Sequence, residues 1–199
     1  MIKTQNIKNK GYTIIETMIS LSIFIIVILT GMSALLNANL VHQKSQDMRS
    51  ILDNLSFIME DMSRNIRIGY NYRCISGIFS NTSISTAQSC SLGGAMAFES
   101  DVGNSESDAD QWVYKIEGSS GTYNISKSTD GGNNFTQLNL NEINIDSTSG
   151  FSVLGAPSPT AGDSQQPLVI IKLSGKITFK DIVTPFSLQT SVSQRIIDI

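Results

Sequence analysis

The first part of the chain is almost uniformly apolar. From Tyr12 to Val41 the only charged side chain is that of Glu16. After residue 41 the pattern changes, because charged side chains appear between apolar ones that recur every three or four residues. The recurring apolar positions are Leu40, Met48, Ile51, Leu52, Leu55, Ile58, Met59, Met62 and Ile66. This spacing predicts an amphipathic helix over residues 42–69 that continues the apolar stretch of residues 12–41.

One helix is therefore expected from about Thr13 to Ile68. The next proline is Pro157, and Gly69 supplies a residue that commonly ends a helix. At 1.5 Å per residue this helix would be about 80 Å long. The apolar half is long enough to cross a membrane, which takes about 20 residues. The amphipathic half is expected to bury its apolar stripe against the rest of the protein.

The remainder, residues 70–199, is rich in Ser, Thr, Asn and Gly and reads as a β-rich head. Turns are predicted at 118–121 and 130–133, an exposed loop at 155–167 and a connection at 180–184. The expected strands are Ala95–Glu99, Trp112–Glu117, Thr122–Lys127, Ile143–Ile145, Phe151–Leu154, Leu168–Phe179 and Pro185–Ile197. A long helix followed by antiparallel strands predicts an α+β fold, in which the sheet packs on the C-terminal half of the helix.

A basic leader of residues 1–11 precedes the apolar segment. It contains Lys3, Lys8 and Lys10 and no acidic residue. Positive charge before an apolar span favours a cytoplasmic N-terminus, so the head is expected outside the cytoplasmic (inner) membrane. A cleaved secretory signal would have a shorter apolar core, followed by a small-x-small site that residues 36–39 lack. A plain membrane anchor would leave Glu16 unexplained, because a carboxylate within an apolar span is costly unless it is paired or protonated.

The segment Lys10-Gly11-Tyr12-Thr13-Ile14-Ile15-Glu16 resembles the processing site of type IV prepilins and type II secretion pseudopilins. The resemblance implies that a prepilin peptidase cuts after Gly11 and methylates the new N-terminus at Tyr12. It also implies that Glu16, the fifth mature residue, guides assembly by pairing with the terminal amine of its own or a neighbouring subunit. Tyr12 and Glu16 lie one turn apart on a helix, which fits such a pairing.

The chain departs from this family at two positions. Tyr12 stands where Phe or Met is usual, and Ser33 stands where major pilins often carry proline. The strand phrase 112–116, the Gly-Gly turn at 131–132 and the ending 188–195 resemble J-type minor pseudopilins and W-type minor pilins. The pilin fold and a minor subunit that initiates or caps a type IV pilus or type II secretion pseudopilus are the implied expectations. Its implied partners are other subunits, the peptidase and an inner-membrane assembly platform.

Composition argues against other functions. The formal net charge is −3, and Arg64, Arg67 and Arg73 are the nearest approach to a basic cluster, so nucleic acid is not expected as a partner. No phosphate-binding glycine loop or catalytic constellation is visible, and the single histidine, His42, lies on the helix. The chain is therefore not expected to be an enzyme. The alternative function is that of an adhesin or binding module on a static membrane anchor.

Two further groups of side chains could form a covalent bond or bind a metal ion. Cys74 and Cys90 are the only cysteines, and in an exported head they are expected to form a disulfide; the alternative is two unrelated buried thiols. No cofactor is expected, but the spacing of Glu106, Asp108 and Asp110 suggests calcium, which some heads of the resembling family bind. The glycine and the distal glutamate of an EF-hand loop are missing, which favours a solvated acidic loop.

Overall fold

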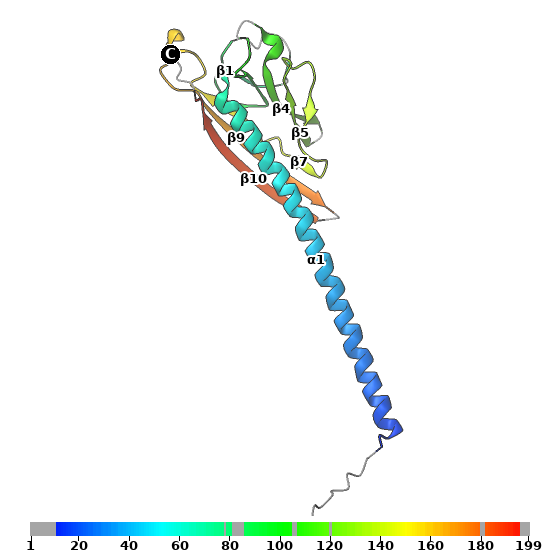
Figure 1. Ribbon diagram of the computed structural model, residues 1–199. Helices are drawn as coiled ribbons and strands as arrows, with labels where there is room; N and C mark the ends of the chain where they lie inside the picture. The colour runs from blue at the N-terminus through cyan, green and yellow to red at the C-terminus, as the bar shows by residue number, and fades with distance from the viewer. Residues whose placement is uncertain are drawn as a thin grey trace, which may run out of the picture. The chain divides into compact units, whose positions relative to one another are not determined.

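The computed structural model describes residues 11–77, 79–80, 86–104, 107–119, 121–179 and 182–195. By its contacts the chain divides into two units, Met1–Asp47 and Met48–Ile199. Helix α1 (Ile14–Ile68) contributes to both units (Figure 1). Its length of 55 residues confirms the predicted long N-terminal helix.

In the first unit, the side chains of α1 face outward. Every described residue up to Gln46 is exposed, including the apolar ones. The hydroxyl groups of this segment donate to main-chain carbonyls one turn back: Thr17 to Ile14, Ser20 to Glu16, Ser22 to Met18 and Thr30 to Ile26. These polar groups therefore need no water, which makes the segment compatible with a hydrocarbon environment. By length and composition, α1 can cross a membrane once.

The second unit combines the C-terminal part of α1 with an antiparallel sheet. Ten strands are described: β1 (Tyr70–Ile75), β2 (Cys90–Gly93), β3 (Ala95–Glu99), β4 (Trp112–Ser119), β5 (Thr122–Ser128), β6 (Thr136–Gln137), β7 (Ile143–Ile145), β8 (Gly150–Leu154), β9 (Leu168–Phe179) and β10 (Ile182–Ser193). Two 3₁₀ turns, Asp108–Asp110 and Pro159–Ala161, lie in the connections. The α+β class is as predicted.

The strand order is β1-β3-β4-β5-β7-β9-β8-β2, with β10 beside β9 and β6 beside β5. Strand β9 is central: β10 pairs with its whole length on one side, and β7 and β8 share the other side. The two ends of this path, β1 and β2, approach each other. The main chains of Cys74 and Gln88 bond at 2.9 Å just before β2 begins.

One hydrophobic core joins the helix to the sheet. Leu55, Met62 and Ile66 of α1 are fully buried, and they share a cluster with side chains from both halves of the sheet. Tyr72 donates its hydroxyl to the carbonyls of Ile66 and Gly69 at 2.6 Å, which fixes the exit of the chain from α1. At Gly69 a Cβ atom would lie 2.4 Å from the ring of Phe98, so only glycine fits there. Most of the predicted apolar stripe is thus core packing, whereas Leu40 and Leu52 are exposed.

Several predicted strand boundaries need correction. The last strand begins at Ile182, three residues before the expected Pro185, so residues 182–184 belong to a strand and not to a connection. Strand β4 continues through Gly118 and Ser119, which were expected in a turn. Strands β1, β2 and β6 were not predicted. The predicted strands at 95–99, 143–145 and 168–179 have the bounds that the structure shows.

Candidate functional site

The start of α1 holds the residues that the sequence singled out. Thr13 caps the helix, because the main-chain N–H of Glu16 donates to the Thr13 hydroxyl at 3.3 Å and to its carbonyl at 3.1 Å. Thr13 and Glu16 thus have the spacing of a capping box, in which the side chain of the glutamate at the third helical position can accept a hydrogen bond from the main-chain N–H of the cap residue. In the first turn, the Glu16 carboxylate also lies near the positive end of the helix dipole.

The Glu16 side chain takes no part in the capping hydrogen bonds. It is exposed, and its carboxylate has no hydrogen-bond or ion-pair partner among the described residues. Tyr12, Glu16, Ser20 and Phe24 follow at four-residue intervals and line one side of the helix. A cation placed on this side, such as a terminal amine, would meet the carboxylate directly. Gly11 is also open, since a Cβ there would have no neighbour within 4 Å.

Cys74 and Cys90 are joined by a disulfide in the structure, with their Cα atoms 5.7 Å apart. Cys74 is buried at the end of β1, and Cys90 begins β2. Main-chain bonds between Gln88 and β1 reinforce the same junction. The bond therefore ties together the two strands that end the sheet path.

The acidic stretch is only partly within the described residues, because Glu106 lies outside them. Asp110 accepts from the main-chain N–H of Asn104 at 2.8 Å, and Asp108 lies 3.5 Å from the side-chain nitrogen of Gln111. Within the residues that the structure describes, no group of three or more His, Cys, Asp or Glu side chains is arranged to hold a metal ion. Because Glu106 is one of the three suggested ligands, the calcium site stays a prediction.

The structure draws attention to Glu99, which the sequence analysis named only as the last residue of a predicted strand. It is fully buried, and its Oε1 accepts from Gln111 at 2.6 Å, while its Oε2 has no partner among the described residues. Burial raises the pKa of this carboxyl, and the nearby charges of Asp110 and Asp108 raise it further against the lowering effect of Gln111. The sequence signal was an acidic residue closing an otherwise apolar strand.

A second polar group links the helix to the sheet. The Asp61 carboxylate of α1 accepts from Lys127 of β5 and from the Tyr114 hydroxyl of β4, each at 3.1 Å, and from Asn65 at 3.0 Å. Lys127 also lies 4.3 Å from the ring centre of Trp112. Burial alone would raise the pKa of Asp61, but these donors outweigh it and hold the pKa below its usual range. Asp61 is one of the charged side chains between the apolar positions of the amphipathic segment, and no partner for it was predicted from the sequence.

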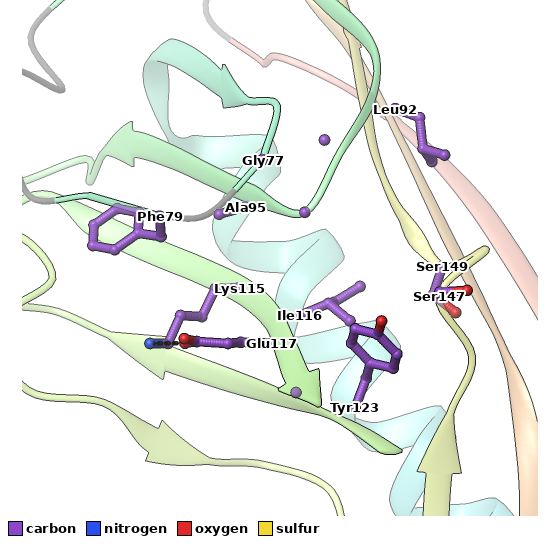
Figure 2. Close-up of a pocket in the computed structure, with 13 residues that line it drawn as sticks. Gly77, Phe79, Leu92, Ala95, Lys115, Ile116, Glu117, Tyr123, Ser147 and Ser149 are labelled. Carbon is purple, nitrogen blue, oxygen red and sulfur yellow. Dashed lines mark ion pairs between the residues drawn. The ribbon is translucent and has the colours of Figure 1, made fainter. Parts of the chain in front are cut away.

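One hollow of the head lies beside the start of β3 and the end of β4, with a volume of about 380 Å³ (Figure 2). Its charged side chains, Lys115 and Glu117, form an ion pair with each other. Lys115 also lies 3.8 Å from the centre of the Phe135 ring. Both charges are thus already compensated within the protein, and the remaining lining is small or apolar.

Comparisons with known proteins find no family model, no curated protein and no solved structure that matches this chain.

Proposed function

We propose that this chain is the precursor of a type IV pilin-like subunit, cut after Gly11 and assembled through α1 into a filament of the cell envelope. Its role is that of a minor pilin or minor pseudopilin, which initiates the filament or lies at its tip. Before assembly the subunit is held in the inner membrane by the N-terminal part of α1, with its head outside the cytoplasm.

The observation that carries this proposal is the unpartnered carboxylate of Glu16 at the start of an apolar helix. Glu16 is the only charged side chain between Tyr12 and Val41. Placing such a charge in hydrocarbon costs about 2.5–3.5 kcal/mol on insertion scales, so it needs a partner there. Cleavage after Gly11 creates an ammonium group on Tyr12, one helical turn away. Pairing of Glu16 with that amine, or with the amine of the next subunit, removes the penalty.

The rest of the first unit supports the same function. Its exposed apolar side chains suit both lipid and neighbouring helices, and the hydroxyl groups of Thr17, Ser20, Ser22 and Thr30 are bonded within the helix. A subunit can therefore move from the membrane into a helical filament core without exposing unsatisfied polar groups. In a packed core an unpaired Glu16 would be unfavourable, so the ion pair selects one axial register. Extraction from the membrane is the work of the assembly platform that the resemblance implies.

A statically anchored adhesin or binding module is the second candidate. The 380 Å³ hollow beside β3 and β4 favours it, because it offers a place for a ligand on the head. In that case Gly11 would stay intact and α1 would serve only as an anchor.

The decisive experiment is the intact mass of the full chain after co-expression with a prepilin peptidase. We expect a mass corresponding to a chain that begins at Tyr12 and carries one added methyl group. The Gly11→Leu variant is the control and should remain uncut. The full mass in both proteins would reject the pilin-like function and favour the static anchor.

A further inference from the structure

Strand β10 is a long, neutral edge strand. All twelve of its residues, Ile182–Ser193, pair with β9 in one unbroken antiparallel register. Its other edge has no strand beside it among the described residues (Figure 1). No charged residue occurs from Ile182 to Gln194. Natural proteins usually protect such an edge with charges or bulges, because its free main-chain groups bind other strands.

Pro185 identifies which main-chain groups point away from β9. It lies within the regular ladder, opposite Lys176, although it has no N–H to donate. Proline is accepted in an edge strand where the N–H position faces outward. In an antiparallel pair the outward positions alternate, so Val183, Ser187, Gln189, Ser191 and Ser193 also direct their main-chain groups to the free edge. From Ser187 to Ser193 the edge is uninterrupted by proline.

The other ends of the sheet are not available for pairing. Strand β1 and strand β2 end the sheet path, but the Cys74–Cys90 disulfide and the main-chain bonds of Gln88 tie them to each other. Among the described strands, β10 therefore provides the one long free edge. The protein can accept a strand there, and a second copy could offer only the same edge, in a two-fold symmetric pairing.

We propose that the free edge of β10, from Ser187 to Ser193, binds an extended segment of a different polypeptide by β-strand addition. The chemistry of the site selects the partner, because alternating N–H and C=O groups are matched by another extended main chain. This inference rests on the proposed function in one respect. Neighbours in a polar filament make head-to-tail contacts that use two different surfaces, so the second edge must come from another kind of subunit.

The test measures amide hydrogen exchange at single residues of the full-length protein, in detergent and in purified assemblies. Gln189 and Ser191 should exchange rapidly in detergent and be protected in the assembly. Leu188 and Thr190 are internal controls, since their amides bond to β9 and should be protected in both. Rapid exchange of Gln189 and Ser191 in the assembly would overturn the proposal. Protection that appears in the isolated protein together with a dimer would also overturn it, in favour of self-pairing.

A matched pair of variants tests the same edge in cells. Gln189→Pro removes one outward N–H and no bond to β9, whereas Gln189→Ala keeps the N–H. We expect incorporation of the proline variant to fall about tenfold and the alanine variant to match wild type, with both proteins melting within a few degrees of wild type. Equal incorporation of both variants would refute the edge contact alone. Absence of the wild-type protein from any assembly would refute the proposed function and the edge contact with it.

Discussion

Asp61 of α1 and Lys127 of β5 form a half-buried ion pair, with Lys127 Nζ 3.1 Å from Asp61 Oδ2. Each side chain is 19% exposed, so solvent screens the pair only in part. The Tyr114 hydroxyl and the Asn65 amide bond to the same carboxylate. This group of four side chains fastens the helix to the middle of the sheet.

The first prediction concerns this ion pair. Asp61→Asn should lower the free energy of unfolding by about 1–2 kcal/mol, because Lys127 would lose its charged partner. The pKa of Asp61 is lowered in the folded protein, so its stabilising effect is present above pH 4 or so and is lost as the pH falls further. Denaturant unfolding of wild type and variant between pH 3 and 7 should therefore converge at the acid end.

The control for this prediction is Asp53→Asn on the exposed face of the same helix. It should change the unfolding free energy by less than about 0.5 kcal/mol at any of these pH values. An equal effect of the two substitutions would show that the ion pair with Lys127 contributes nothing specific.

The second prediction concerns Glu99. Its pKa is raised in the folded protein, so the ionised carboxylate opposes folding, and stability falls as the pH rises through the ordinary range toward the folded pKa. Glu99→Gln should stabilise the protein at pH 7 by on the order of 1 kcal/mol, because it removes a buried charge that has no cation nearby. The advantage should shrink as the pH approaches 4. A destabilised variant at pH 7 would indicate that the charge has a partner.

The third prediction concerns the disulfide. The Cys74→Ser/Cys90→Ser double variant should lose about 3 kcal/mol of stability, since the bond closes a loop between residues 16 positions apart. In a protein of this size, that corresponds to a melting temperature lower by about 10 °C. A reductant should lower the melting temperature of wild type toward that of the variant. It should leave the variant itself unchanged, which is the control.

The fourth prediction concerns Glu16. Glu16→Ala and Glu16→Gln should still be cut after Gly11, but their incorporation into filaments should fall at least about tenfold, because neither side chain can neutralise a terminal amine. Glu60→Ala, at an exposed position in the other half of α1, is the control and should assemble normally. Normal assembly of the Glu16 variants would contradict the proposed role of the carboxylate.

The sequence was sufficient where one strong periodicity described an element. Helix α1 followed from an apolar run and a three-to-four spacing, and β9 followed from a long stretch between the predicted loop at 155–167 and the predicted connection at 180–184. Strand β1 was missed although Tyr70, Tyr72 and Cys74 alternate with Asn71 and Arg73. The strand is short, follows the helix after one residue, and contains an irregularity where Asn71 takes a φ of +54°. The predicted start of β10, Pro185, is three residues too late, because proline can also occupy an outward-facing position within an edge strand.

Within the candidate site, the arrangement of nearby residues was predictable from the sequence, whereas contacts between distant elements were not. Tyr12 and Glu16 are four positions apart in the sequence, which is the spacing that puts two side chains on one side of a helix. The contacts of Asp61 with Lys127 and of Glu99 with Gln111 depend on how helix and strands pack. No local pattern specifies which acidic residues become buried, because that depends on the register of elements far apart in the chain.

The cross-link between β1 and β2 has a mechanical consequence. A sheet loses its outermost strands first. Here the disulfide joins β1 and β2, the two ends of the strand order, so neither can separate while the bond is oxidised. Thermal fraying or a pulling force should therefore open the head first at the outer strand, β10, while the cross-linked side resists. The end of β10 is held by the N–H of Arg195, which donates to the carbonyl of Arg67 at 2.8 Å. Any strand that docks along β10 would thus cover the one long edge that remains open among the described strands.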